Sequence, residues 1–551
     1  MKKIISIVLV LLMIFAMSVP CFAQTGEKVA IAQNTSDIPV VAIYGDGEAL
    51  YNQEGEKVFK FSEILSLFGG GEDGAIAEAS INILMPFLIE GLLNDKWDNY
   101  YKALEKEIGD IFAEVRLDNN GEDPENKVDI SAEKRAEMEN KLTVDSYDSK
   151  GYYGFEDYLF LYDWRLDPYA VADLFHEHIE KVKEVTGQDK VSIVIRCLGS
   201  SVVFAYIEKY GLDSIHGISM NSTVSNGAEI ISEPISGKFK IDGDAINRFL
   251  YDMQALGMLN IDSFVNDTIN MLEKTELVYM LTDSVKRELY GKIVKGVTSA
   301  LSISTFFTWP SYWSCVAQDD LDDALLYVFG PQGSEKRTEY SGLIDKIENY
   351  HEKVGSKTYE IVNRIKSEGK NLCIISKYGF QIAPICESRN EIGDQFVSTK
   401  RSSFGATTSD VFSPLDDAYI QQQTALGLER YISPDNIVDA STCLFPDYTW
   451  FMKGSSHSVW SDFENSLMYT VATADKQLTV NDFDCTQFVY RNNATGEAYP
   501  LTKENCNTES WSEDSKTDTY DKPYGKYIVM LRVLIDWLIK LFRLISNLFP
   551  A

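Results

Sequence analysis

The chain has 551 residues, enough for a large hydrophobic core together with an inserted subdomain. Acidic residues outnumber basic ones by 83 to 51, which gives a formal net charge of −32. This charge argues against nucleic acid as a partner and against a general attraction to anionic lipid headgroups. It is compatible with a soluble exported enzyme.

The first 23 residues have the pattern of a secretory signal peptide. Two lysines at positions 2 and 3 precede an apolar run over residues 4–17, and residues 21–23 read Cys-Phe-Ala. We expect cleavage after Ala23, because signal peptidase prefers small residues on either side of a bulky one at such a site. The alternative is a retained membrane anchor, but the run is short for a span of about 20 residues. We therefore expect a secreted protein that is extracellular or associated with the cell surface.

Short apolar strands alternating with helices predict an α/β fold with a mostly parallel sheet. Four apolar runs are typical of buried strands: residues 38–43, 158–161, 190–195 and 216–220. Helices are predicted at about 168–185 and 198–210, the first beginning at Asp167-Pro168. Its residues Val171, Leu174 and Ile179 are expected to face the sheet. Strand and helix spacing of this kind is typical of parallel sheets flanked by helices.

The alternation lapses after residue 223. It resumes with a strand at 371–376 and a last strand near 448–452, and the residues between read mainly as helices with an aromatic stretch at 306–313. We therefore predict a mainly helical cap inserted into an α/β-hydrolase core. The predicted divisions are a core of residues 36–223 and 367–475, a cap of 224–366, a C-terminal extension of 476–526 and a helix of 527–549.

The last of these segments, residues 527–549, is predicted to be an amphipathic helix. Polar residues recur every three or four positions and leave a wide apolar face. Two interpretations stay open: the helix packs against its own domain, or it lies in a membrane interface as a peripheral contact. Charges recur along the whole segment and argue against a membrane span.

The strongest chemical signal is the segment Ile195-Arg196-Cys197-Leu198-Gly199, where a buried strand ends and a helix begins. This is the context of a nucleophile elbow, G-x-S-x-G, whose tight turn holds a reactive side chain above the sheet. Cysteine also supports covalent catalysis, through a thioester, and the helix N-terminus behind it favours a thiolate. Against this, Ile195 stands where the first glycine belongs. The alternative interpretation is a buried, inert cysteine at a strand end.

An acid and a histidine follow in the chain order that such hydrolases use. Asp394 follows the strand predicted at 371–376, and His457 lies in the loop after the strand predicted at 448–452. Three rival acids lie farther from the strand end: Asp410, Asp416 and Asp417. The other histidines lie on helices, one of them polar, or at the start of a strand: His176, His178, His351 and His216.

Several segments resemble motifs of the lecithin:cholesterol acyltransferase family of α/β-hydrolases. Residues 162–165, Tyr-Asp-Trp-Arg, resemble its Y-D-W-R segment. Residues 44–50, Tyr-Gly-Asp-Gly-Glu-Ala-Leu, are similar to its P-G-x-x-G-x-x-L oxyanion loop, with Tyr for Pro and one residue fewer between the glycines. Residues 393–397 resemble G-D-G-x-V with Gln for the second Gly, and residues 310–313 resemble a lid-proximal P-x-x-W. The likeness extends from about residue 39 to residue 457.

This resemblance implies a capped enzyme that hydrolyses a lipid or other hydrophobic ester, or passes its acyl group to an alcohol. Carried over by position, Cys197 attacks the acyl carbonyl, His457 takes and returns the proton, and Asp394 orients the imidazole. The backbone N–H groups of Gly47 and Leu198 hold the oxyanion. The aromatic stretch covers an acyl chain or simply forms cap core. No cofactor and no metal are expected. The family carries serine at the position of Cys197.

Two functions of different classes therefore remain. One is a secreted acyl-ester hydrolase or O-acyltransferase that works through a covalent acyl-thioenzyme, and the other is a catalytically inactive α/β-hydrolase-fold binding protein. The seven cysteines beyond Cys21 lack the C-x-x-C spacing of a zinc site or a redox pair. Because their number is odd, at least one stays unpaired unless chains pair with each other. The first hypothesis predicts that it is Cys197, with the other six available for disulfides.

Overall fold

The computed structural model describes most of the predicted core. The described residues are 36–45, 48–59, 96–111, 113–143, 158–238, 306–483, 487–493 and 496–503, with single positions at 86, 90, 240, 245, 248, 249, 252, 292 and 506. The predicted signal peptide, the helix predicted at 527–549 and Gly47 lie outside the described residues. No helix within the described part of the chain is long and apolar enough to cross a membrane.

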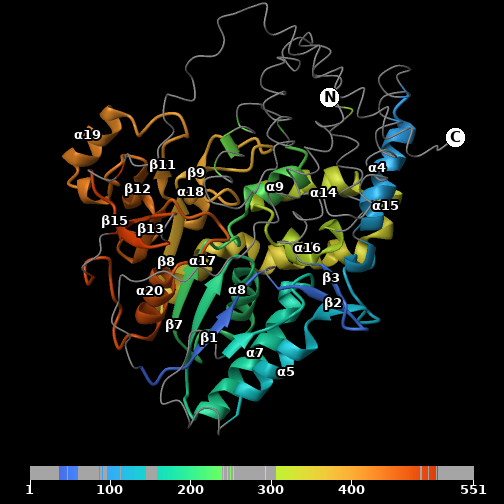
Figure 1. Ribbon diagram of the computed structural model, residues 1–551, viewed down its shortest axis with the longest axis horizontal. Helices are drawn as coiled ribbons and strands as arrows, with labels where there is room; N and C mark the ends of the chain where they lie inside the picture. Colours follow the sequence, from blue (N-terminus) through green and yellow to red (C-terminus); the bar gives the residue numbers. More distant parts are fainter. Residues whose placement is uncertain are drawn as a thin grey trace, which may run out of the picture.

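A mostly parallel eight-stranded sheet forms the centre of the molecule, so the predicted α/β class is confirmed (Figure 1). The strand order is β15-β14-β13-β8-β7-β6-β1-β5, and every neighbouring pair is parallel except β14 and β15. The strands are β1 (Val40–Ile43), β5 (Tyr158–Phe160), β6 (Val191–Arg196), β7 (Ile215–Asn221), β8 (Asn371–Tyr378), β13 (Thr449–Lys453), β14 (Phe488–Arg491) and β15 (Ala498–Pro500).

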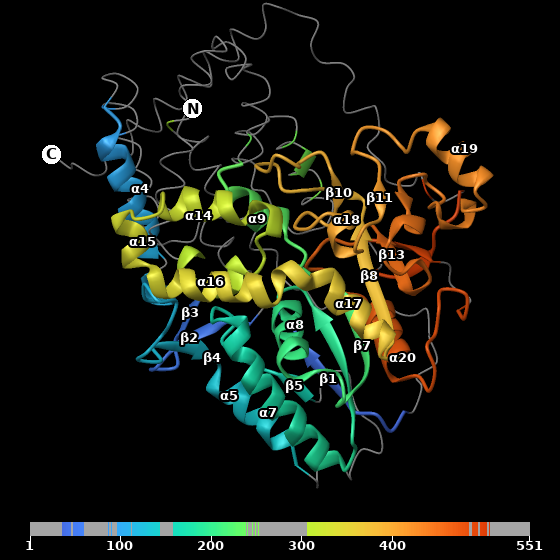
Figure 2. The ribbon, with the colours of Figure 1, turned by 180° about the vertical axis from the view of Figure 1, so that it is seen from behind.

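Helices cover both faces of this sheet, which explains why its central strands read as continuous apolar runs. Helices α7 (Pro168–Thr186), α8 (Gly199–Tyr210) and α17 (Thr358–Ser367) pack together on one face (Figure 2). Helix α20 (Asp462–Thr473) packs on β6, β7 and β8 from the other face. Alternate residues of the strands face α20: the hydroxyls of Ser192 and Ser219 each donate to one of its carbonyls at 2.7 Å. The strand residues at the other alternate positions face α8.

Helix α7 shows how local sequence sets the ends of an element. Asp167 caps it by accepting a hydrogen bond from the Tyr169 N–H at 3.0 Å, and Gly187 ends it in the left-handed conformation. Val171 and Ile179 are buried as predicted. The prediction is wrong for Leu174, which is 51% exposed. Periodicity placed it on the apolar stripe, but the stripe that contacts the sheet layer is narrower.

The described part of the predicted cap is mainly helical. It contains α9 (Glu229–Ile235), α13 (Pro310–Trp313), α14 (Leu321–Phe329), α15 (Glu335–Glu339) and α16 (Ser341–Lys353). The predicted boundary at residue 366 falls inside α17. Because α16 and α17 both pack on α8, this end of the insertion belongs to the helical layer of the sheet.

The sheet does not end at the strand predicted near 448–452. Strand β14 adds to β13 in parallel and β15 follows in antiparallel, so part of the predicted extension 476–526 belongs to the sheet. These are the last two strands at one end of the sheet, and strands this short carry too few residues for a periodic signal. The smaller elements are β2 (Leu50–Asn52), β3 (Lys57–Phe59), α4 (Asp98–Ile111), β4 (Val128–Ile130), α5 (Ala132–Lys141), β9 (Phe380–Gln381), β10 (Ile392–Gly393), α18 (Thr399–Ser402), β11 (Thr407–Thr408), α19 (Asp417–Ala425) and β12 (Val438–Asp439).

Gly217 of β7 lets α20 approach the sheet. A Cβ atom at this position would lie 2.2 Å from the backbone oxygen of Ala472. Gly217→Ala is therefore expected to lower the free energy of unfolding by about 3 kcal/mol or more, because backbone atoms must move to relieve the contact. Urea unfolding of the two proteins measures this loss.

Gly187→Ala is the control for this prediction. Gly187 has a φ of +67° and a ψ of +15°, the left-handed conformation, with open space around it, so its replacement costs only the backbone strain of about 1 kcal/mol. If Gly217→Ala were no less stable than Gly187→Ala, the close approach of α20 to β7 would be wrong.

Candidate active site

Cys197 occupies a strained turn between β6 and α8. Its φ is +48°, a left-handed conformation that a residue other than glycine adopts only where the surroundings impose it. Its N–H donates to the Asn221 carbonyl at 3.3 Å, which continues the hydrogen bonding between β6 and β7 through the turn. The thiol is half-buried. The structure thus places Cys197 where the prediction did, at the end of a central parallel strand.

Two glycines allow the chain to pack closely around this turn. A Cβ atom on Gly199 would lie 2.7 Å from the Ile43 carbonyl oxygen, so α8 can begin here only with glycine. A Cβ atom on Gly45 would lie 3.0 Å from the Leu198 nitrogen and 3.3 Å from the Cys197 sulfur. The loop after β1 therefore lies directly against the thiol and the Leu198 N–H. Gly47, predicted as an oxyanion donor, lies outside the described residues and stays a prediction. The sequence did not single out Gly45, although it belongs to the same quoted motif.

The Tyr-Asp-Trp-Arg segment holds both sides of the same loop. The Tyr162 hydroxyl donates to the Tyr44 carbonyl at 2.9 Å, and the Trp164 indole N–H donates to the Glu48 carbonyl at 3.1 Å.

Arg165 is fully buried, and its guanidinium pairs with Asp163 at 2.7 Å and with an Asp123 oxygen at 3.1 Å. This pairing fixes the segment, so the segment can fix the loop.

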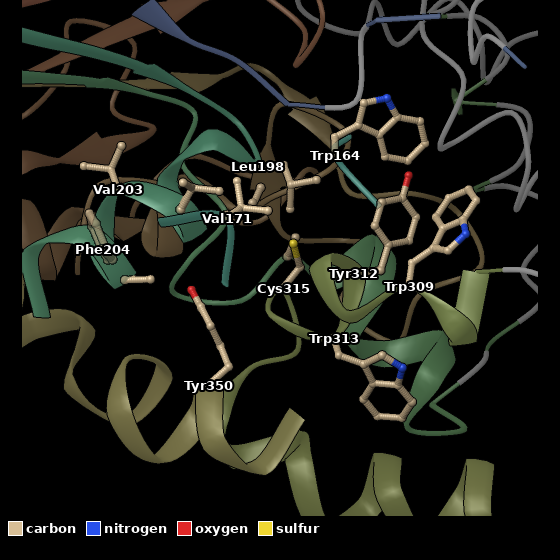
Figure 3. Close-up of a cluster of buried hydrophobic side chains, with 14 of the residues drawn as sticks. Trp164, Val171, Leu198, Val203, Phe204, Trp309, Tyr312, Trp313, Cys315 and Tyr350 are labelled. Carbon is tan, nitrogen blue, oxygen red and sulfur yellow. The ribbon is translucent and has the colours of Figure 1, made fainter. Parts of the chain in front are cut away.

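Aromatic side chains of the predicted cap pack as core beside this segment. Figure 3 shows Trp164, Trp309 and Tyr312 gathered near Leu198. The rings of Trp164 and Trp309 meet edge to face at 5.0 Å, as do those of Trp309 and Tyr312. Trp309 and Trp313 are fully buried. Of the two interpretations of this stretch, the described contacts favour cap core.

Asp394 and His457 form a buried hydrogen-bonded pair. His457 Nδ1 lies 2.8 Å from Asp394 Oδ2, and the His457 N–H donates to the Asp394 carbonyl at 2.9 Å. The other carboxylate oxygen accepts the N–H groups of Phe396 at 3.1 Å and Val397 at 2.9 Å. Nδ1 of the imidazole is therefore used for orientation. Nε2 is buried and has no hydrogen-bond partner among the described residues.

The surroundings of Asp394 keep it ionised. Burial by itself raises the pKa of this carboxyl, but the nearby imidazole, the hydrogen bonds from His457 and Val397 and the charge of Lys377 outweigh it. The pKa of Asp394 therefore lies below its ordinary value. Phe396 also lies parallel to the His457 imidazole, with ring centres 4.7 Å apart. Nothing in the sequence pattern marks Phe396 for this contact.

The rival acids do not reach a histidine. Asp410 accepts backbone N–H groups of its own turn, and Asp416 caps α19. Among the described residues, the histidine that forms an ion-pair contact is His457. His351, predicted to lie in a polar helix, is instead buried, and its Nε2 lies 2.9 Å from the Trp313 carbonyl oxygen.

The expectation that six cysteines are available for disulfides is wrong for three of them. Cys373, Cys386 and Cys443 are buried thiols without a disulfide. Cys485 lies outside the described residues. Within the described ranges, no group of three or more His, Cys, Asp or Glu side chains is arranged to hold a metal ion.

Comparison with known proteins adds little to this geometry. No family model matches the sequence, and no curated protein matches it. A chain in a crystal structure described as the Tle4-Tli4 complex is similar at 12% identity, with 62% of this chain and 74% of that chain covered. The TM-score is 0.23, so this likeness carries no argument about function. The triad of Cys197, Asp394 and His457 stays a prediction.

Because the pKa of Asp394 is lowered in the folded state, its carboxylate stabilises the fold above the ordinary pKa of about 4. This contribution is lost as the pH falls through the lowered value. Asp394→Asn is expected to cost about 1.5–3 kcal/mol of unfolding free energy at neutral pH, since a charged hydrogen bond is lost. The difference from wild type should shrink below about pH 4. Urea unfolding at a series of pH values measures it.

Asp417→Asn serves as the matched control, because Asp417 is a rival acid exposed at the start of α19. Its stability should follow wild type at every pH. A difference between Asp394→Asn and wild type that stayed constant down to pH 3 would contradict the assignment of an ionised, buried Asp394.

Proposed function

We propose that the chain is an exported, thiol-dependent acyl hydrolase or O-acyltransferase of α/β-hydrolase architecture. Its substrate class is a lipid or other hydrophobic ester, as the resemblance to the lecithin:cholesterol acyltransferase family implies. One observation carries the proposal. A half-buried thiol in a positive-φ turn and a buried histidine follow strands β6 and β13 of one parallel sheet. The Nδ1 of this histidine pairs with Asp394, and its Nε2 has no hydrogen-bond partner among the described residues.

In the first step, the Cys197 thiol gives its proton to Nε2 of His457, and the sulfur attacks the acyl carbonyl carbon. The C–S bond forms while the carbonyl π bond opens to an oxyanion, which the Leu198 N–H and the loop after β1 hold. The C–O bond to the alcohol then breaks, and the imidazolium returns its proton to the leaving oxygen. An acyl-thioenzyme remains.

In the second step, water or an alcohol attacks the thioester and gives its proton to His457. The C–S bond breaks, and the thiolate takes back the proton. Asp394 stays ionised throughout, because its hydrogen bonds and the imidazolium stabilise the negative charge. The reaction needs no metal or cofactor in this scheme.

The proposal is tested by trapping the covalent intermediate. A p-nitrophenyl ester with a medium-length acyl chain should release a burst of nitrophenol equal to the enzyme concentration. Mass spectrometry should then place the acyl group on Cys197, in a bond that hydroxylamine cleaves. Cys197→Ala should show neither. Iodoacetamide should label Cys197 at least about tenfold more slowly in His457→Ala than in wild type, since the thiolate loses its partner.

His176→Ala is the control for the histidine variant, because His176 is a half-buried residue of α7 that stacks on Tyr210. It should leave the labelling rate unchanged. If Cys197 of wild type reacts no faster than an ordinary thiol and no acyl adduct forms on any ester tested, the enzyme proposal is wrong. The protein should then be screened for a ligand, as the binding-protein alternative requires.

Gly45→Ala separates oxyanion binding from thiol reactivity. The added methyl group would stand 3.3 Å from the Cys197 sulfur and 3.0 Å from the Leu198 nitrogen, where the oxyanion is expected. The acylation rate should therefore fall about a hundredfold, the usual effect of losing an oxyanion donor. Alkylation by iodoacetamide needs no oxyanion and should change less. Equal losses in both reactions would instead mean that the methyl group displaces the thiol.

A further inference from the structure

A lysine lies buried beneath the loop that carries His457. Lys377 is the seventh residue of β8, and its side chain is fully buried. Its ammonium donates to the carbonyl oxygens of Ser456 at 3.3 Å and His457 at 3.4 Å, and also to that of Val459. One cation thus holds three carbonyls on both sides of the imidazole. The predicted strand ended at Ser376, two residues before the observed end at Tyr378.

Glu464 holds the lysine in place from α20. Its Oε1 lies 3.3 Å from Lys377 Nζ and accepts the Asn221 side-chain N–H at 2.9 Å, and neither charged side chain is exposed. Its Oε2 accepts from the Ser461 N–H at 2.8 Å and from the Ser461 hydroxyl at 2.7 Å. These contacts and Lys377 overcome the effect of burial and hold the pKa of Glu464 below its ordinary value.

The helix cap and the ion pair therefore use the two oxygens of one carboxylate. Ser461 and Glu464 form a capping box, which fixes where α20 begins. The loop from β13 to α20 is held at the cap by Glu464 and at its carbonyls by Lys377. His457 lies in the part of this loop that Lys377 holds, four residues before the cap residue Ser461, with its Nδ1 on Asp394.

Stability alone does not explain a charged pair in this place. Removing two charges from water is costly, and an apolar pair of similar volume often stabilises a fold as well or better. The lysine also lies against the N-terminal turn of α20, where the helix dipole disfavours a cation. What an apolar pair cannot supply is a donor for three main-chain carbonyls that turn toward one point.

We propose that Lys377, held by Glu464, is a positioning residue for His457. It fixes the main chain of residues 456–459 so that the imidazole keeps its hydrogen bond to Asp394 and presents Nε2. The catalytic part of this role rests on the proposed function, whereas the effect on the imidazole does not. Lys377 touches neither the substrate nor the reacting atoms.

The experiment replaces Lys377 by methionine, whose unbranched side chain is one atom shorter and has no donor. Two properties are measured on the full chain: the rate of iodoacetamide labelling at Cys197, and the downfield proton NMR signal of the His457 Nδ1–H. His457→Gln assigns that signal by its loss. Lys377→Met should slow the labelling at least about tenfold and broaden or shift the signal, because small displacements at a reacting group have large effects.

Lys370→Met is the matched control. Lys370 is also a buried lysine next to β8, but its ammonium donates to the Ile215 carbonyl at 2.9 Å, at the opposite end of the strand. This variant should keep both the labelling rate and the proton signal of wild type. If it loses them to the same degree as Lys377→Met, the loss reports general destabilisation and the proposal is overturned.

The double variant Lys377→Met/Glu464→Gln removes both charges, so that no unpaired charge stays buried. If Lys377→Met alone does not fold, this double variant tests whether Lys377 positions His457. The proposal expects its unfolding midpoint to recover while the labelling rate and proton signal stay altered. A folded variant without Lys377 that keeps the wild-type signal overturns the proposal. If wild-type Cys197 proves unreactive, the proposed function falls, and the signal in these variants still decides the role of Lys377.

Discussion

The common carboxyl edge of the parallel strands is the constraint on which the candidate site depends. Neighbouring strands of a parallel sheet run in one direction, so the residues after them meet at one edge. The register aligns Arg196 of β6 with Asn221 of β7, and the ladder continues through β8 to β13. Cys197 and His457 follow strands β6 and β13 at this edge, although the whole predicted cap separates them in the sequence.

The charged side chains Arg165, Lys377 and Asp394 at this edge are buried, so each charge needs a partner within the protein. Arg165 has two carboxylates, Lys377 has Glu464 and three carbonyls, and Asp394 has an imidazole and two N–H groups. Each charge also contacts main-chain groups of a neighbouring segment. The same contacts that compensate for desolvation therefore fix the loops, which is why charge satisfaction and site geometry are linked in this fold.

The sequence predicts what depends on local pattern and chain order. Apolar runs and the cap at Asp167 locate strands and helices, and the order of elbow, acid and histidine leads to Asp394 and His457. The prediction fails where contacts with residues distant in the chain determine whether a side chain is buried. Lys377 reads as the charge that ends an apolar strand, and only α20 and the His457 loop make a buried position possible for it. His351 reads as polar surface, but α13 covers it.

The glycine positions of the elbow and acid motifs have different physical requirements in this chain. Gly199 is needed for space, because a Cβ atom there would meet the Ile43 carbonyl. Gln395 replaces a glycine at a φ of +83°, so this turn carries strain. The position of Ile195 does not require a glycine. It lies in β6, and its side chain is fully buried in the main core. Its bulk is therefore accommodated in the core before the turn begins, and the argument for an abandoned site rests on the cysteine alone.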